Sequence, residues 1–126
     1  MADPQPSVRI ALDVQDLDRS CEFYRRALGF QVARTERAGM IFEARSLRSD
    51  RHPSVQLDLR AGFGKRIQGT SPGGITKLSF REPRLAEAIA GLNGLVRWIG
   101  PAPAADPVPP AVAFNDPDAY QIELFA

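Results

Sequence analysis

The chain is poor in three residue types that often build functional sites, because its 126 residues include one cysteine, one histidine and one tryptophan. A single cysteine excludes an intramolecular disulfide and any cysteine-rich metal cluster. Cys21 falls on the apolar stripe of a predicted helix, where we expect it to pack in the core. The only histidine, His52, precedes Pro53 in a polar stretch, so we expect it to be an ordinary surface residue.

Long apolar runs and an excess of one charge are also missing. No stretch approaches the roughly 20 apolar residues of a membrane-spanning helix, and the opening MADPQPS has neither the basic start nor the apolar run of a secretory signal. Lys and Arg number 16 against 15 for Asp and Glu, so the net charge of +1 gives no field that attracts nucleic acid or acidic membranes. We therefore expect a soluble, cytoplasmic protein with neither nucleic acid nor membrane among its partners.

The sequence does contain an internal repeat. Residues 8–30 and 75–95 both run from alternating apolar residues into helical periodicity, and each copy leads on to a second alternating strand, at 54–60 and 119–126. A supersecondary unit of this size cannot bury its apolar face alone, so the copies must pack on each other or on another chain. With 44% hydrophobic and 25% charged residues, the chain has the composition of one globular domain. We expect its ligand to bind between the copies.

The first copy is predicted to fold as a βαβββ module. Residues 8–14 alternate as a half-buried strand, Asp16 or Asp18 can cap the helix that follows, and Gly29 suits a left-handed C-terminal cap. Three further strands are predicted, the first two as a hairpin, at residues 30–35, 40–47 and 54–60. The glycine-rich stretch 61–74 has no hydrophobic period and is predicted to link the two modules.

The second copy repeats the same order of elements. A strand at residues 75–81 leads into a helix predicted to begin at Pro83, since a proline N–H is not needed at a first helical position. Further strands are predicted at residues 95–99, 111–114 and 119–125. Segment 100–110 contains five prolines, which exclude central-strand pairing and indicate a stiff, plain surface connection. A pocket bordered by this segment remains an alternative, and Trp98 fits a pocket wall, the core or a subunit interface.

Two segments, LDVQDLDRSCEFYRRALGF and FNDPDAYQIELF, resemble the glyoxalase/bleomycin resistance/extradiol dioxygenase superfamily, also called the vicinal oxygen chelate fold. The aspartate after the first strand, the Phe23-Tyr24 pair, the helix exit at Gly29 and the DPD turn occur in the order of that family. The resemblance implies an α+β fold in which two βαβββ modules form a cup or partial barrel from curled mixed sheets, with the helices outside. Residues 1–126 then form one domain, with module one at 7–60, the linker at 61–74 and module two at 75–126.

The resemblance also implies where relatives hold a divalent metal, on the first and last strands of the modules. The usual histidine positions fall on Arg9 and Lys77, the acidic position of the fourth strand falls near Asp58, and the glutamate of the closing strand is retained as Glu123. A guanidinium has no lone pair to give and stays protonated, so we expect no metal and no other cofactor. The chain also has Ala119 where relatives often have glycine, which costs about 1 kcal/mol if this position needs positive φ.

The alternation of the strands independently places the four charged side chains on the sheet faces away from the helices. Together with their polar neighbours they are the predicted ligand-binding residues of the cup: Arg9, Gln56, Asp58, Lys77, Ser79, Gln121 and Glu123. In one interpretation the two cations and two carboxylates only form a neutral charge network. In the other, the cations grip a carboxylate, phosphate or enolate-like oxygen of a ligand, with Arg9 as a bidentate clamp.

Three functions compete on this basis, and no catalytic residue is assigned. The leading hypothesis is metal-independent binding of a small, possibly anionic, molecule in the cup. The alternative is a lyase or isomerase that stabilises an oxyanion with Arg9 or Lys77 and uses Glu123 or Asp58 as a base. The third is an interaction module whose repeats complete a shared barrel in a homodimer. A homodimer is compatible with the other two functions as well, because the resemblance implies relatives that often build their cups across two chains.

Overall fold

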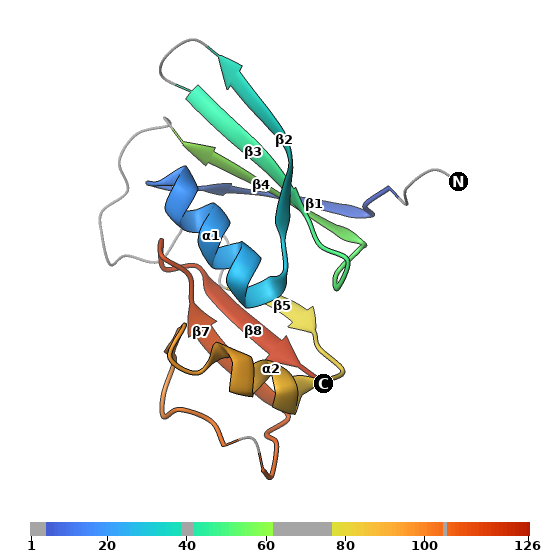
Figure 1. The fold of residues 1–126 in the computed structure, drawn as a ribbon, viewed down its shortest axis with the longest axis vertical. Coiled ribbons are helices and arrows are strands. Elements are labelled where there is room, and N and C mark those ends of the chain that lie inside the picture. The colour runs from blue at the N-terminus through green and yellow to red at the C-terminus, as the bar shows by residue number, and fades with distance from the viewer. Residues whose placement is uncertain (1–4, 39–41, 62–76, 105) are drawn as a thin grey trace. The chain divides into compact units, whose positions relative to one another are not determined.

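The computed structural model describes residues 5–38, 42–61, 77–104 and 106–126 (Figure 1). The chain divides into two compact units, unit 1 (Met1–Ile67) and unit 2 (Gln68–Ala126). Their boundary falls inside the predicted linker, most of which lies outside the described residues. Within the described residues, each unit consists of one helix and one open four-stranded mixed sheet, so the α+β class and the two modules are confirmed. Among the described helices, none is both long and apolar enough to cross a lipid bilayer.

Unit 1 has the predicted βαβββ order. Its elements are β1 (Val8–Asp13), α1 (Leu17–Leu28), β2 (Gln31–Ala38), β3 (Phe42–Arg48) and β4 (Val55–Ala61). The sheet order is β1-β4-β3-β2, in which β1 and β4 run parallel and the other neighbours antiparallel. The parallel pairing brings the first and last strands of the unit side by side, although they are far apart in the sequence.

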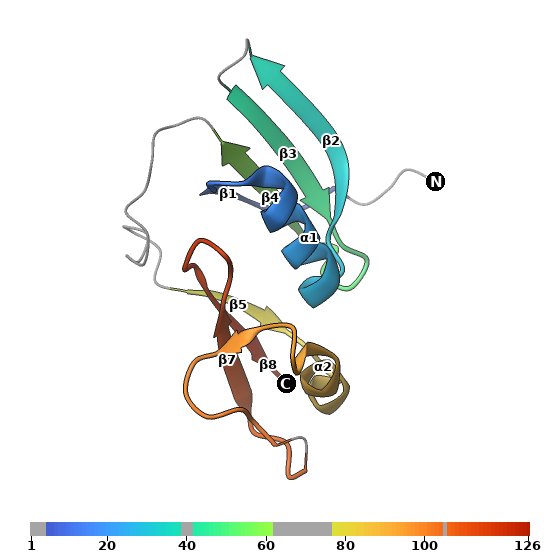
Figure 2. The ribbon, with the colours of Figure 1, turned by 60° about the vertical axis from the view of Figure 1, so that its left-hand side comes forward.

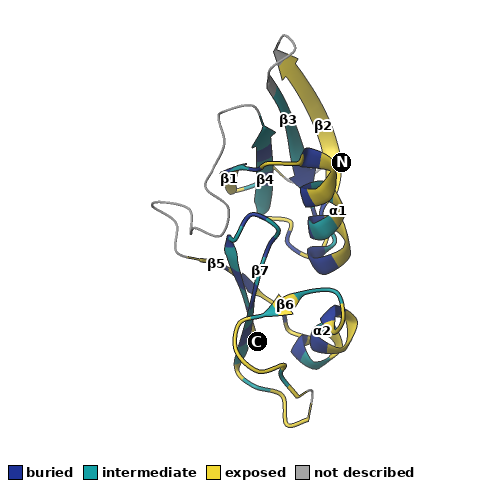
Figure 3. Cartoon of the chain, turned by 90° about the vertical axis from the view of Figure 1, so that its left-hand side faces the viewer, coloured by how far each residue is buried: buried dark blue, intermediate teal, exposed yellow. Residues whose placement is uncertain are grey.

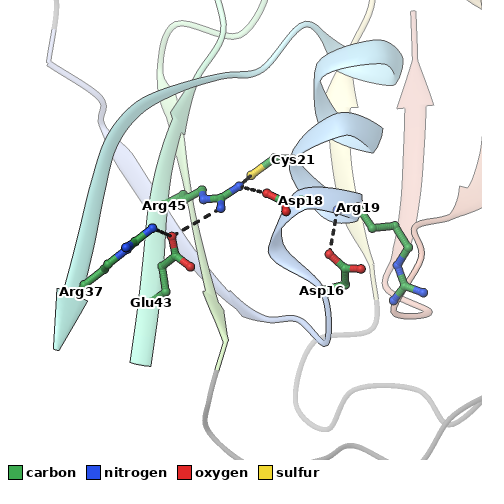
Figure 4. Close-up of polar contacts among 7 residues, drawn as sticks. All are labelled: Asp16, Asp18, Arg19, Cys21, Arg37, Glu43 and Arg45. Carbon is green, nitrogen blue, oxygen red and sulfur yellow. Dashed lines mark hydrogen bonds and ion pairs between the residues drawn. The ribbon is translucent and has the colours of Figure 1, made fainter. Parts of the chain in front are cut away.

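The ends of α1 follow directly from the local sequence. Of the two predicted caps, Asp16 is the one used, because its Oδ1 accepts a hydrogen bond from the backbone N–H of Arg19 at 3.0 Å (Figure 4). Gly29 ends the helix at φ 73°, a left-handed conformation that a residue without Cβ adopts at little cost. Both positions were predicted from residue type alone.

The core of unit 1 lies between α1 and one face of its sheet. Tyr24 and Leu28 of the helix are fully buried, as are Leu12 of β1 and Leu57 and Leu59 of β4. The expectation that Cys21 packs in this core is wrong. Its side chain is half-buried and lies 3.7 Å from Nη1 of Arg45, at the polar margin of the interface between helix and sheet (Figure 4).

Unit 2 repeats the order with shorter elements (Figure 2). They are β5 (Leu78–Arg81), α2 (Leu85–Leu92), β6 (Arg97–Trp98), β7 (Ala111–Asn115) and β8 (Gln121–Phe125), in the sheet order β5-β8-β7-β6. Residues of β7 and β8 alternate between buried and half-buried up to the exposed Phe125, as expected for strands with one face on a core (Figure 3). Phe114, Ile122 and Leu124 of the sheet and Ile89 of α2 are fully buried and belong to the apolar core of unit 2.

Two boundaries in unit 2 differ from the prediction. The helix does not begin at Pro83, which lies in a turn; it begins at Leu85, because the carboxylate of Glu82 accepts from the N–H of Arg84 at 3.4 Å and holds that turn. The strand predicted at 95–99 shrinks to β6, since the N–H groups of Leu95 and Val96 bond back to the carbonyl of Leu92 at 2.9 and 3.2 Å. Residues 75 and 76 of the first predicted strand lie outside the described residues.

Candidate functional site

The candidate site lies on the open faces, a term used here for the face of each sheet that points away from its own helix. In unit 1 the strand register sets Arg9 beside Gln56, and Gln56 beside Arg48. Two residues along, Asp58 on β4 lies opposite Ser46 on β3. Paired residues of neighbouring strands project to the same side, so these side chains share one surface.

Asp58 is the acceptor at the centre of this surface. Its Oδ2 lies 3.3 Å from Nη2 of Arg9, while its Oδ1 accepts from Ser46 Oγ at 2.9 Å and from Gln56 Nε2 at 2.8 Å. The Asp58 side chain is only 20% exposed, whereas that of Arg9 is 67% exposed. The carboxylate is therefore fixed by three donors, and the guanidinium extends from it into solvent. Sequence reasoning missed Ser46, which only the register of β3 with β4 could have indicated.

A depression of about 320 Å³ opens over this face of unit 1. Four arginines and two carboxylates contribute to its lining: Arg9, Arg34, Arg48, Arg60, Asp58 and Glu36. The cations therefore exceed the anions by two, within a chain whose total net charge is +1. These lining residues therefore carry a local excess of positive charge that the composition of the whole chain conceals, although Arg60 also contacts Asp13 at 2.9 Å.

Unit 2 carries an equivalent cluster around Glu123. Lys77 Nζ lies 3.0 Å from Glu123 Oε2, and Ser79 Oγ donates to Glu123 Oε1 at 2.9 Å. The hydrogen bond from Lys77, and then that from Ser79, lowers the pKa of the Glu123 carboxyl below its ordinary value of 4.5. Gln121 precedes Glu123 by two residues on β8 and so lies on the same face.

The two clusters occupy matching places in the repeat. In unit 1 Asp58 pairs with Ala11, two residues after Arg9, and in unit 2 Glu123 pairs with Ser79, two residues after Lys77. Each cation therefore contacts the carboxylate of its own unit, whereas the sequence interpretation grouped the four charged side chains in one network. Of the seven predicted site residues, three belong to the cluster in unit 1 and four to the cluster in unit 2.

The donor set of these clusters does not fit a metal centre of the histidine type. At the two matching positions Arg9 and Lys77 are cations that already contact carboxylates, and neither offers a lone pair. Within the described ranges, no three His, Cys, Asp or Glu side chains gather closely enough to hold a metal ion. His52 is not the surface residue expected: it is buried and stacks on Phe30 with ring centroids 6.1 Å apart.

The proline segment of unit 2 also differs from the expectation of a plain connection. A depression in unit 2 is lined by Trp98 and by three prolines of this segment, Pro101, Pro103 and Pro109. The segment therefore borders a pocket, which was the alternative interpretation of the sequence. Trp98 is half-buried, and its ring stands edge-on to Phe114 at 5.8 Å. Unit 1 thus has a charged depression, and unit 2 has one whose described lining residues are of apolar type apart from Glu123.

A comparison with family models finds one match, to the family described as bleomycin resistance protein-like N-terminal, over residues 7–41. This stretch spans β1, α1 and β2 of unit 1. Comparison with the curated proteins finds no significant match. The family model therefore supports the resemblance over the first part of the chain only.

Solved structures share the fold over nearly the whole chain. The trypanothione-dependent glyoxalase I of Leishmania major is 21% identical, with 97% of this chain and 86% of that chain covered and a TM-score of 0.73. The protein SMU.1112c is 22% identical, with 97% and 98% covered and a TM-score of 0.71. A mutant of the fosfomycin resistance protein FosX from Listeria monocytogenes, complexed with Mn(II) and 1S,2S-dihydroxypropylphosphonic acid, is 14% identical, with 94% and 88% covered and a TM-score of 0.68.

Proposed function

We propose a function from the premise that this chain has the fold of the glyoxalase/bleomycin resistance/extradiol dioxygenase superfamily, as its sequence resemblance implied. The protein binds a small anionic molecule on the open face of unit 1 and does so without a metal ion. The observation that carries this proposal is the depression lined by four arginines and two carboxylates. A fold of this kind hosts many chemistries, so the side chains of the site and not the fold must select the ligand.

Arg9 is the principal ligand-binding residue in this proposal. It contacts Asp58 through Nη2 only, at 3.3 Å, and two thirds of its side chain is exposed. A guanidinium carries five N–H donors, and two parallel ones can hold a carboxylate, phosphonate or phosphate in bidentate fashion. Gln56 and Asp58 orient Arg9 from the neighbouring strand, while Lys77, Ser79, Gln121 and Glu123 form the corresponding cluster of unit 2.

Binding is favoured over lyase or isomerase chemistry by the electrostatics of Glu123. A general base works best when its pKa lies near the operating pH. Lys77 and Ser79 lower the pKa of Glu123, which makes this carboxylate a weaker base. A phosphonic acid accompanies the metal in the FosX complex, so an anionic ligand has a precedent among proteins of this fold. Cations at the matching positions of this chain take over the role of attracting such an anion.

Isothermal titration of the full chain with methylphosphonate, an anion of the right charge and small size, tests the proposal. We expect Arg9→Gln to weaken binding about tenfold, the loss typical of one charge-assisted hydrogen bond. Arg25→Gln is the matched control, because Arg25 is also exposed and ion-paired, with Glu22 at 2.6 Å, but lies on α1. Absence of binding by the unchanged chain, or equal losses in both variants, would refute the proposed site.

Metal independence needs a separate measurement. The protein purified without chelator and dialysed extensively should contain less than stoichiometric transition metal by elemental analysis, and EDTA should leave methylphosphonate binding unchanged. A stoichiometric metal that survives dialysis and disappears in Glu123→Ala would contradict the proposal.

We further propose that the protein acts in the cytoplasm as a homodimer. Large apolar side chains remain exposed in both units, including Val8, Val32 and Phe125 at 48%, 47% and 37%. A second copy would remove such side chains from water. Sedimentation velocity over a hundredfold concentration range should show a dimer; a monomer throughout would contradict this part of the proposal.

A further inference from the structure

A row of four polar side chains crosses the open face of unit 1. The strand register pairs Arg9 on β1 with Gln56 on β4, Gln56 with Arg48 on β3, and Arg48 with Gln31 on β2. This polar row follows the sheet order β1-β4-β3-β2, so its members are neighbours across the sheet (Figure 1). All four project away from α1, because Leu57, which follows Gln56 in the chain, is fully buried on the helix side and paired residues share a face.

The polar row borders two depressions of unit 1. Arg9, Gln56 and Arg48 line the charged depression of about 320 Å³, and Arg48 and Gln31 line another of about 590 Å³. The two depressions adjoin, because Arg48 and Ala33 line both of them. A ligand held by Arg9 therefore has room to extend along the row as far as Arg48.

Arg48 lies between two uncharged neighbours of the polar row. Gln56 and Gln31 are amides, which carry no charge, whereas the guanidinium of Arg48 stays protonated at any working pH. Gln56 is held in place, because its Nε2 donates to Asp58 Oδ1 at 2.8 Å. Two arginines and two glutamines give the row a charge of +2, so a ligand lying along it meets two cations separated by an amide.

The spacing of the strands sets the distance between these two cations. Neighbouring strands lie about 4.8 Å apart, so Arg9 and Arg48, which are separated by β4, have backbones roughly 10 Å apart. Side chains of a strand stand roughly perpendicular to the sheet, so the two guanidinium groups keep a similar separation. We propose that the anion site of the proposed function, on which this inference rests, takes a linear ligand with an anionic group at each end, one on Arg9 and the other on Arg48. A chain of about five CH₂ groups joins the two ends at this spacing and lies over Gln56.

Arg48 is thereby a further ligand-binding residue, which the sequence interpretation did not include. A ligand with one anionic group is held by Arg9 alone. A second anionic group on the same molecule binds Arg48 as an intramolecular step, so it adds affinity without a second loss of translational freedom. Length of the ligand, and not charge alone, therefore decides affinity at this site.

Isothermal titration of the full chain compares three probes in buffer freed of metal ions by a chelating resin. They are methylphosphonate, pentane-1,5-diphosphonate and methylenediphosphonate, the last with two phosphonate groups on a single carbon. We expect pentane-1,5-diphosphonate to bind about tenfold more tightly than methylphosphonate and about fivefold more tightly than methylenediphosphonate. Equal affinities of the two diphosphonates, with methylphosphonate still bound, would overturn the two-ended ligand and leave the anion site standing. Failure of all three probes to bind would refute the anion site as well.

Two variants locate the second anionic group. Arg48→Gln should weaken binding of pentane-1,5-diphosphonate about fivefold more than binding of methylphosphonate. The ratio of the two affinities within one variant does not depend on the folded fraction, so a loss of stability cannot imitate this result. Arg37→Gln is the matched control, because Arg37 is an exposed arginine of the same sheet that pairs with Glu43 on the opposite face, and it should keep the full ratio. A ratio that survives in Arg48→Gln, or falls equally in Arg37→Gln, would overturn the proposal.

Discussion

Among single residues, Ala119 is held in a conformation that its side chain disfavours. Its φ is 71°, in the left-handed region. The surrounding turn enforces this angle, because Asp116 Oδ1 accepts from the N–H groups of Asp118 and Tyr120 at 2.9 and 2.8 Å, and the N–H of Ala119 bonds to the carbonyl of Asp116 at 3.1 Å. From the sequence, Ala119 was expected to be strained only if its position needs a positive φ. The structure shows that it does.

We predict that Ala119→Gly stabilises the protein by about 1 kcal/mol, because glycine adopts this φ without a Cβ clash. Urea unfolding followed by circular dichroism measures the change in free energy. Ala111→Gly in β7 is the control and should destabilise by a similar amount, since a strand alanine has no such strain to relieve. A loss of stability in Ala119→Gly would contradict the argument.

Glu123 gives a prediction for pH. Lys77 and Ser79 lower the pKa of its carboxyl in the folded state, so the folded state binds this proton less readily than the unfolded chain. The contribution to stability is present above the ordinary pKa of 4.5 and is lost as the pH falls through the folded value.

Carboxyl titration by NMR should show Glu123 below 4.5, and Lys77→Gln should move its pKa upward. Arg84→Gln provides a control within unit 2, because Arg84 contacts Glu87 at 3.7 Å and should leave the titration of Glu123 unchanged. If the pKa of Glu123 is the same in Lys77→Gln as in the unchanged chain, Lys77 does not stabilise the ionised carboxylate in solution.

Among the elements, α1 depends most clearly on its N-terminal cap. The bond from the Arg19 N–H to Asp16 satisfies one of the backbone donors that a helix start leaves without an intrahelical partner. We predict that Asp16→Ala lowers the free energy of unfolding by about 1 kcal/mol and that Asp16→Asn, which keeps a side-chain acceptor, loses only a few tenths. Equal losses in the two variants, measured by thermal or urea unfolding, would show that the charge of Asp16 matters more than its hydrogen bond.

The side chain of Arg45 joins β3 to α1 (Figure 4). Its Nη1 donates to Asp18 Oδ1 at 2.7 Å, and its Nη2 donates to Glu43 Oε1 at 3.4 Å. Glu43 also contacts Arg37 at 3.4 Å, so one carboxylate lies between two guanidinium groups. Arg45 is 19% exposed, but Asp18 is 88% exposed, which means that water screens one end of the bridge.

We predict that a double-mutant cycle of Arg45→Met and Asp18→Asn gives a coupling free energy of about 0.5 kcal/mol, the range of exposed pairs. The distance of 2.7 Å between Arg45 and Asp18, taken alone, would suggest a larger coupling free energy. The Glu22 and Arg25 pair on α1, at 2.6 Å and about half exposed at each end, is the control cycle and should give a similar value. A coupling above 2 kcal/mol would mean that the bridge is shielded from water in solution.

For the whole molecule, the near balance of charge predicts a pH of lowest solubility. With 16 basic and 15 acidic residues the isoelectric point is about 7.9. Proteins associate most readily where their net charge approaches zero. Precipitation by ammonium sulfate should therefore need the least salt near pH 8 and more at pH 6 and pH 10, and a minimum that stays near pH 6 would contradict this reasoning.

Several features of the whole fold could be read from local patterns. Strand alternation and the 3.6-residue period gave the βαβββ order of both units, and residue type gave the cap at Asp16 and the left-handed Gly29. The failures arose where groups only two or three residues away along the chain compete for backbone bonds. Pro83 is an acceptable first helical residue, but Glu82 holds it in a turn, and Leu95 bonds back to the end of α2 in place of a strand partner.

The sequence by itself determined the sheet face of four charged side chains, because alternation along a strand places Arg9, Asp58, Lys77 and Glu123 on the faces away from the helices. Only the tertiary structure showed their partners. Ser46 reaches Asp58 because β3 and β4 pair in one particular register, and the prolines approach Trp98 because the segment after β6 returns to the sheet. Side-chain direction is set by neighbours in the chain, whereas the distance between strands, and with it the chemistry of a pocket, depends on long-range pairing.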